Sequence, residues 1–399
     1  MPDQLEPTQK DVIIIGGGPS GLSLALALAP LGLDIAVIDK QHPDAIAEPE
    51  MDGRDIALTH LSRTILEKMQ VWQRIDKKFI HPLEKAEVIN GSSPLALHFE
   101  REDHSKEPLG FLIANHRIRR TLHEQVLSHK NIELLLQAEV SSISTAADQA
   151  EVTITQKNGS STLRASLVVG ADSRFSSARR MMGIGAKMKD YGRVMIVCNM
   201  RHEASNHNTA RENFLYGKTC AILPLGENKS SIVITVPASE ASRLQNIDAD
   251  EFSAEATHMF NGCLGDMELV SERFSYPLIG CYSDKFIATR FALVGDAAVG
   301  MHPVTAHGYN LALRSVDTLT AEIARAQRIR LDIGSQEVLR AYQRKHWLVS
   351  RPIYDVTNAI VRLYTDDRPL PSLVRSAAIN ISDHVKPFKQ LVTHMLTRT

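Results

Sequence analysis

The chain has 399 residues with 45 Lys and Arg against 46 Asp and Glu, and this formal net charge of −1 argues against a nucleic-acid-binding protein with a broad basic surface. The length suggests about two connected domains with sizeable cores. Four cysteines without paired spacing and 16 histidines without a zinc motif predict core thiols in a reducing compartment and no metal site.

The amino-terminal region predicts a strand, a helix and a second strand. Residues 1–11 are polar and lack the basic start of a signal peptide, so we expect a cytoplasmic protein. Residues 12–38 are apolar, but glycines and prolines interrupt them, which disfavours a membrane span. We predict strands at Val12–Ile15 and Asp34–Ile38, with a helix between them that ends at about Leu31.

A glycine motif stands at the first of these strand ends. Gly16 suits the turn, Gly18 a close approach of pyrophosphate, and Gly21 tight packing of helix on strand. Ser20 lies at the start of the helix, and Asp39 follows the second strand, where an acid binds ribose hydroxyls. The acid disfavours a 2′-phosphate, so the motif predicts FAD or NAD as the resident dinucleotide.

Arginines mark the next two segments. Arg54 precedes a short apolar strand, and a helix follows it within residues 52–75. Another helix is predicted from Asn115 to about Ser128, and arginines near its start are unfavourable unless an anion lies close by. Arg117, Arg119 and Arg120 are the arginines concerned. A surface salt bridge is the alternative for Arg54.

A buried strand from Leu167 ends in Asp172, and strands with turns surround it. Asn158-Gly159 predicts a hairpin turn before it. After it, Arg179 and Arg180 could attract the phosphates of a nicotinamide cofactor or cap a helix. From Val194 to Pro237, β-rich runs alternate with turns, which predicts an antiparallel sheet.

The most informative stretch is 291–314. A short apolar strand, Phe291–Val294, leads into Gly295 and Asp296, whose carboxylate can accept hydrogen bonds from a ribose-like chain. Gly308 precedes a helix with Asn310 in its first turn, and the amino end of this helix suits an anion.

The region after Glu322 is helical and basic. Residues 325–399 carry 13 Lys and Arg against 6 Asp and Glu. This excess of positive charge suits contact with the anionic inner face of a membrane or with a biosynthetic complex. The alternative is a helical face that is simply solvated. Arg351-Pro352 and Arg368-Pro369-Leu370-Pro371 are predicted helix breaks.

Several of these stretches together resemble the class A flavoprotein aromatic hydroxylases, and among them the ubiquinone-biosynthesis hydroxylases. Residues 291–314 are similar to the family pattern GDAA…HP…GxGxNLGLRD, 52–75 to DxRAIAL, 167–180 to GADGxxSxxR, and 210–233 to A-x-E-x-F…LPL…S-V. The chain departs from these patterns at Ser173, where Gly is usual. In the GDAA…HP…GxGxNLGLRD motif it has Val299 for His, His307 for Gln and Ser315 for Asp.

The resemblance implies an α/β fold of the p-hydroxybenzoate hydroxylase type: a Rossmann-like FAD-binding domain, a mixed or antiparallel substrate-domain sheet and a helical carboxyl-terminal region. The FAD-binding domain is expected in three parts, 1–80, 111–180 and 286–330. The substrate domain is expected at 81–110 and 181–285, and the basic helical region at 331–399.

The same resemblance implies a monooxygenase. FAD is the resident cofactor, NAD(P)H the transient electron donor, and a flavin 4a-hydroperoxide passes one oxygen of dioxygen to a polyprenylated phenol or benzoquinol. Arg54, Arg117 and Asp172 are expected at the FAD. His302, Pro303 and His307 are the candidates near the ring that reacts.

Other functions remain open at this point. One is hydroxylation of another small phenol, and another is a reductase of the same fold that does not consume dioxygen. A halogenase is disfavoured because its W-x-W-x-I-P motif is missing. A prenyl-carrier protein without flavin is disfavoured because the flavin motifs are present.

Overall fold

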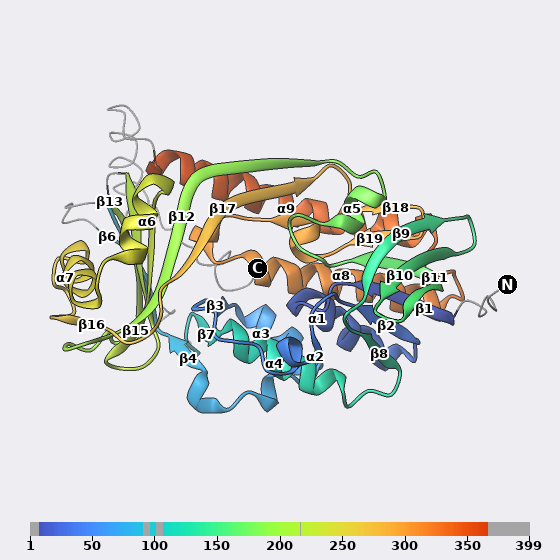
Figure 1. The fold of residues 1–399 in the computed structure, drawn as a ribbon, viewed down its shortest axis with the longest axis horizontal. Helices are drawn as coiled ribbons and strands as arrows, with labels where there is room; N and C mark the ends of the chain where they lie inside the picture. The colour runs from blue at the N-terminus through green and yellow to red at the C-terminus, as the bar shows by residue number, and fades with distance from the viewer. Residues whose placement is uncertain (1–7, 91–95, 101–106, 216, 366–399) are drawn as a thin grey trace.

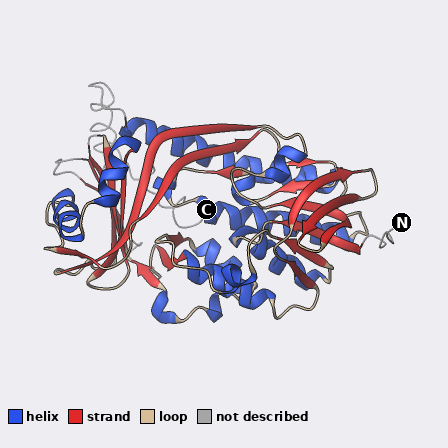
Figure 2. Ribbon diagram, viewed as in Figure 1, coloured by secondary structure: helices blue, strands red, loops and turns tan. Residues whose placement is uncertain are grey.

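The computed structural model describes residues 8–90, 96–100, 107–215 and 217–365. Two sheets stand at opposite ends of the molecule, and a long two-stranded ribbon connects them (Figures 1 and 2). Among the described helices none has both the length and the apolarity that a membrane span requires. The α/β architecture with a mixed second sheet and a helical end confirms the predicted fold class.

The first sheet is parallel around the glycine motif. Its order is β18-β19-β11-β1-β2-β8, and β10 pairs with β11 and with β9. The four pairings from β19 through β11, β1 and β2 to β8 are parallel, so the carboxyl ends of these strands meet at one edge. The strands are β1 Thr8–Ile15, β2 Ile35–Ile38, β8 Ile132–Leu135, β9 Glu139–Thr145, β10 Ala150–Gln156, β11 Gly159–Gly170, β18 Ile287–Ala288 and β19 Phe291–Leu293.

Helices cover this sheet because its strands are apolar on both faces. Ile13, Ile14 and Val168 are fully buried, as parallel strands between helical layers require. Helix α1 packs against α8 and α4, and α8 packs against α3 and α9. The helices of this part are α1 Pro19–Leu28, α2 Pro43–Ala47, α3 His60–Lys68, α4 Asn115–Val126, α5 Ser177–Met181, α8 Gly308–Arg328 and α9 Gln336–Thr365.

The second sheet is antiparallel except where β13 pairs with β5 in parallel. Its order is β20-β17-β12-β15-β14-β13-β5-β6, and β16 pairs with β12. A separate core forms where α6 Ala238–Asn246 and α7 Ala249–Met259 cover it. The strands are β5 Lys85–Asn90, β6 Ala96–Glu100, β12 Ala186–His202, β13 Thr209–Leu215, β14 Lys218–Pro224, β15 Lys229–Pro237, β16 Met267–Leu269, β17 Phe274–Ser283 and β20 Val299–Gly300.

The ribbon of β12 and β17 runs from this sheet back to the first one, and α9 lies along it (Figure 1). Its register shifts between Asp190 and Val194, so that β12 bulges there. A small third sheet, β3 Asp55–Leu58, β7 Gly110–Ala114 and β4 His81–Leu83, lies between the two ends. How these segments divide into domains stays a prediction.

Three local expectations are wrong. Helix α9 continues through Pro352, whose exposed position lets the helix lose one hydrogen bond while its buried side keeps packing. The hairpin turn is Lys157-Asn158, because Gln156 pairs directly with Gly159. Cys263 is exposed in the turn after α7, whereas the other cysteines are buried. The predicted break at residues 368–371 lies outside the described residues.

Candidate functional site at the edge of the first sheet

The turn between β1 and α1 requires its glycines for different reasons. Gly16 has φ of +114°, and a Cβ there would lie 2.5 Å from the carbonyl oxygen of Ala171. A Cβ on Gly21 would lie 1.8 Å from the carbonyl oxygen of Gly16, so α1 sits directly on the turn. Gly18 has no protein atom within 4 Å of its Cβ position, so open space lies over the motif there.

Asp39 lies beside this turn at the end of β2. Its Oδ2 accepts a hydrogen bond of 2.6 Å from the amide of Gly17, and its Oδ1 accepts one of 2.8 Å from Gln41. The end of the second strand is therefore joined to the glycine turn.

The turn after β19 meets the same place. Gly295 has φ of +60°, and a Cβ there would lie 2.4 Å from Ser20 Oγ at the start of α1. Its amide donates to Ser315 Oγ at 3.2 Å, so the serine that replaces the usual Asp supports the turn. Two motifs that are about 280 residues apart in the sequence thus form one surface.

The loop after β11 is the third segment of this surface. Asp172 Oδ2 accepts from the amide and hydroxyl of Ser177, at 2.8 and 3.0 Å, and from the amide of Ala178. Its Oδ1 is buried and has no hydrogen-bond partner among the described residues. Ser173 has φ of +118°, so serine keeps a backbone conformation that favours glycine.

Arg174 connects this loop to the turn after β19. Its Nη2 donates to Asp296 Oδ2 at 3.0 Å, and its Nη1 donates to the carbonyl of Ile279 at 2.8 Å. Sequence reasoning missed this pair, because no spacing rule relates the two loops.

Arg179 does not offer its charge to a phosphate. The residue is buried, and its guanidinium donates to the carbonyls of Ala297 and Arg174 at 2.9 and 3.0 Å. It holds the turn after β19 in place, and the idea that it attracts the nicotinamide cofactor is not supported.

The loop before α8 contains the predicted catalytic residues. His302 is buried, its Nδ1 accepts from the amide of Val304 at 3.2 Å, and its ring meets Tyr191 edge-on at 4.8 Å. Burial, with the charges of Lys189 and Arg193, lowers the pKa of His302 to about 4. The ring is therefore neutral at physiological pH and carries its proton on Nε2.

Pro303 begins a short 3-10 turn, Pro303–Thr305, and His307 is the buried residue that caps α8. Ala306 follows the turn with φ of +52°. Gly308 has no protein atom near its Cβ position, so the helix start also borders open space. The first turn of α8 leaves amides without partners inside the helix, and its dipole favours an anion.

Asn310 lies in the first turn of α8, as predicted, and its side chain bonds to other segments of the protein. Its Oδ1 accepts from the amide of Thr59 at 3.1 Å and from Ser62 Oγ at 2.6 Å, and its Nδ2 donates to the carbonyls of Ala57 and Ala306 at 2.8 and 2.9 Å. The side chain is buried and fully bonded within the protein. It fastens α8 to the β3–α3 segment.

Arg54 lies at the start of β3, next to α4. Its Nη2 pairs with Asp52 Oδ2 at 2.6 Å, and its guanidinium lies 5.3 Å from the ring centre of Tyr276. Burial alone would raise the pKa of Asp52, but the ion pair with Arg54 and a hydrogen bond from Asn115 lower it below its ordinary value. Because Arg54 is half-exposed, the same guanidinium is accessible to a ligand.

Arg117 is in the first turn of α4, where its guanidinium lies 3.6 Å from the ring centre of Phe79. The backbone amide of Asn115 donates to the carbonyl of Arg54 at 2.8 Å, so the two predicted arginines are on neighbouring segments. The structure thus brings together the turns after β1, β11 and β19 with the start of α4 nearby.

One titratable group was not predicted. Burial raises the pKa of Asp55 to about 6, and the nearby charge of Asp52 adds to this rise, whereas the neighbouring Ser231 opposes it. A signal was present, because this acid stands where the pattern DxRAIAL has Ala. Ser231 belongs to β15, so Asp55 lies where the third sheet meets the second.

Comparisons with known proteins agree with this geometry. The family model described as FAD binding domain matches residues 9–357. The ubiquinone hydroxylase UbiM of Neisseria meningitidis serogroup C is 42% identical over 97% of this chain and 84% of its own length. The ubiquinone hydroxylase UbiL of Rhodospirillum rubrum is 34% identical over 96% of this chain and 88% of its own length.

A solved structure has the same fold. The p-nitrophenol 4-monooxygenase PnpA from Pseudomonas putida superimposes with a TM-score of 0.76 at 18% identity, over 98% of this chain and 97% of its own. This chain therefore belongs to the FAD binding domain family, in the group of FAD-dependent aromatic hydroxylases that contains the ubiquinone hydroxylases.

Proposed function

We propose that this enzyme uses NAD(P)H and dioxygen to hydroxylate the ring of a polyprenylated phenol or benzoquinol in ubiquinone biosynthesis. The observation that carries the proposal is the convergence of the turns after β1, β11 and β19 in a chain that is 42% identical to a ubiquinone hydroxylase. Bound FAD, reduced by NAD(P)H, supplies the activation of dioxygen.

The residues at the sheet edge fit FAD. Open space over Gly18 and the amides at the start of α1 suit the pyrophosphate, and Asp39 suits the ribose. The buried, unpartnered Asp172 Oδ1 provides an acceptor for a hydroxyl or amide of the cofactor. We further propose that Gly21 and Ser20 shape this cradle without binding through their side chains.

We assign the remaining candidate residues to the isoalloxazine end of the cofactor. In our proposal, Gly295 and Asp296 face the ribityl chain, with Arg54 and Arg117 on the neighbouring segments. The first-turn amides of α8, from Gly308 onward, would stabilise negative charge on a reduced flavin ring. Asn310 supports this arrangement by fixing the helix start, as its four hydrogen bonds indicate.

We assign different roles to the two histidines of the loop before α8. Since the pKa of His302 is lowered to about 4, its neutral ring is a hydrogen-bond donor through Nε2 and a poor base. His307 at the start of α8 is then our candidate for accepting the proton of the phenol, and Pro303 stiffens the loop between them.

Turnover with paired substrates tests this function. FAD-loaded protein is mixed with NADH or NADPH and dioxygen, with a short-chain prenylphenol or with the same phenol lacking its prenyl group. We expect the prenylated compound to accelerate NAD(P)H oxidation and to gain one oxygen atom in mass spectra. Preference for the unprenylated phenol would instead assign a small-phenol hydroxylase. A colourless protein that takes up no FAD would assign a binding module.

We also propose peripheral contact with an anionic lipid surface through α9. Apolar side chains on this helix are unusually exposed, with Trp347 at 48%, Leu348 at 60% and Val356 at 46%. Arginines such as Arg340 and Arg344 are exposed near them. Exposed apolar and cationic side chains on one helix are typical of binding at a lipid interface. Sedimentation with phosphatidylglycerol vesicles, weakened in Leu348→Ser, would support this contact.

A further inference from the structure

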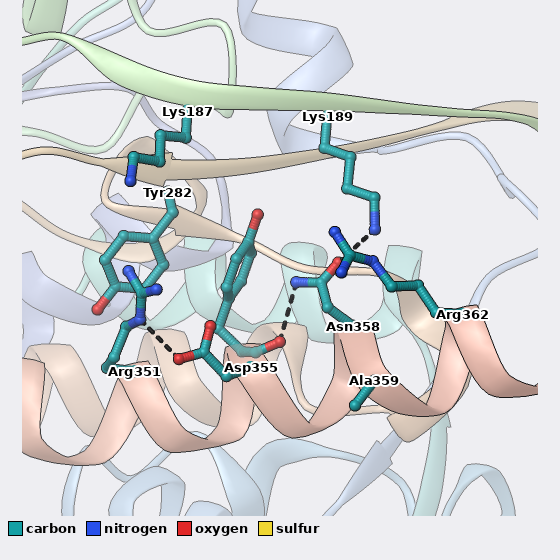
Figure 3. A pocket seen from close by; sticks show the side chains of 9 residues that line it. Lys187, Lys189, Tyr282, Arg351, Asp355, Asn358, Ala359 and Arg362 are labelled. Carbon is teal, nitrogen blue, oxygen red and sulfur yellow. Dashed lines mark hydrogen bonds and ion pairs between the residues drawn. The ribbon is translucent and has the colours of Figure 1, made fainter.

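A pocket of about 480 Å³ lies between the β12–β17 ribbon and α9. Figure 3 shows side chains from both elements meeting in it: Lys187 and Lys189 point from the strand toward the helix, and Arg351 and Arg362 point from the helix toward the strand. Lys187 and Lys189 are two residues apart on a strand, so they share a face.

The charge in this pocket is not balanced. Its lining contains these four cations, and the described carboxylate among them is Asp355, which pairs with Arg351 at 2.7 Å. Within the described ranges, neither Lys187 nor Arg362 has an acidic partner. Together the lining residues carry a net charge of about +3 at neutral pH.

Lys189 is affected by this excess of positive charge. Its Nζ donates to Asn358 Oδ1 at 2.9 Å, so a neutral oxygen takes the place of an acid. Burial and the neighbouring Arg362 lower the pKa of Lys189. Two like charges held close together in a pocket are stabilised by an anion between them.

The walls of the pocket are aromatic. Tyr282 and Tyr354 line it, and the guanidinium of Arg351 lies 5.2 Å from the ring centre of Tyr282. An occupant therefore meets cationic donors and aromatic rings from both the ribbon and the helix. A phosphate suits such donors because it accepts several charge-assisted hydrogen bonds and matches the guanidinium fork.

We propose that this pocket binds the phosphate group of an organic phosphate through Lys187, Lys189, Arg351 and Arg362. Two sources of that group are a phospholipid headgroup and a nucleotide phosphate. The exposed Leu348 and Val356 on the same helix favour the lipid. The proposal does not rest on the hydroxylase reaction, because the pocket contains none of the residues assigned to FAD or to the substrate.

The pocket also contacts the loop of the candidate site. Tyr191, in the bulge of β12, donates its hydroxyl to Asn358 Oδ1 at 2.8 Å and meets the ring of His302 at 4.8 Å. Bulges reorient side chains, and this one places a tyrosine between the pocket and the loop before α8. A phosphate bound at Lys189 and Arg362 is thus one side chain away from His302.

Binding is measured by calorimetry on the FAD-loaded protein, with inorganic phosphate as the first probe. The test variant is Lys187→Gln with Arg362→Gln, because both side chains are exposed and neither forms an ion pair with another described residue. The matched control is Lys157→Gln, which removes a charge in the hairpin turn between β10 and β11. We expect saturable binding, weakened roughly 10-fold or more in the double variant and unchanged in the control.

Two further arms identify the source. NADPH binding that exceeds NADH binding in the wild type, and loses this excess in the double variant, would assign a nucleotide phosphate. Phosphatidylglycerol vesicles that bind more tightly than phosphatidylcholine vesicles, with the same loss, would assign a lipid headgroup. Absence of phosphate binding in all three arms, or binding that the double variant leaves unchanged, would overturn the proposal.

Discussion

Replacing Asn310 by Ala should destabilise the protein even when FAD is absent. The substitution leaves the amide of Thr59, the hydroxyl of Ser62 and the carbonyls of Ala57 and Ala306 without their shared partner. At about 1 kcal/mol for each hydrogen bond, the loss is about 4 kcal/mol. With an unfolding entropy of about 0.8 kcal/mol/K for a chain of this length, the melting temperature should fall by about 5 °C.

The assay is thermal unfolding of the FAD-free protein by circular dichroism, followed by FAD titration. Thr318→Ala is the control, because it removes one local hydrogen bond from the same helix, to the carbonyl of Arg314. It should cost about 0.5 kcal/mol. If Asn310→Ala weakened FAD binding but left unfolding of the FAD-free protein unchanged, Asn310 would be a cofactor ligand and the positioning role would be refuted.

Three further substitutions have expected outcomes in urea unfolding of the FAD-free protein. Ser173→Gly should raise the free energy of unfolding by about 1 kcal/mol, since it relieves a φ of +118°; a loss of stability would contradict this. For His302 the pKa of about 4 in the folded protein lies below the ordinary 6.5, so the unfolded chain gains the proton first and the free energy of unfolding falls as pH drops through this window. His302→Asn should remove about 3 kcal/mol of that fall. An unchanged loss of stability between pH 6.5 and 4 would argue against a buried neutral ring. For Asp55 the pKa is raised from 3.8 to about 6, so the free energy of unfolding falls as pH rises between these values. Asp55→Asn should therefore gain about 3 kcal/mol of stability at pH 7 and little at pH 4. An equal gain at both pH values would exclude titration as the cause.

Much of the candidate site was predictable because strand ends carry the motifs. Gly16, Asp172 and Gly295 each follow a predicted apolar strand, and the parallel pairing of these strands places their carboxyl ends at one edge. Glycine requirements were also readable, since steric rules are local. At Gly295, for example, Ser20 Oγ leaves no room for a side chain.

The contacts that were missed depend on side-chain direction and register. A motif gives the position of Asn310 but not the orientation of its amide toward Thr59. The bulge that brings Tyr191 to His302 comes from a register shift that no alternating pattern encodes. Helix α9 continues past Pro352 because tertiary packing on its buried side outweighs one lost hydrogen bond.

The most direct test of the account is a reaction under ¹⁸O₂. FAD-loaded protein, NAD(P)H and a short-chain prenylphenol are combined, and the product is analysed by mass spectrometry. An aromatic monooxygenase predicts one ¹⁸O atom in the new ring hydroxyl and none when the label is in water. Consumption of NAD(P)H that yields hydrogen peroxide and unlabelled, unchanged phenol for every prenylated phenol and quinol offered would contradict the proposed function.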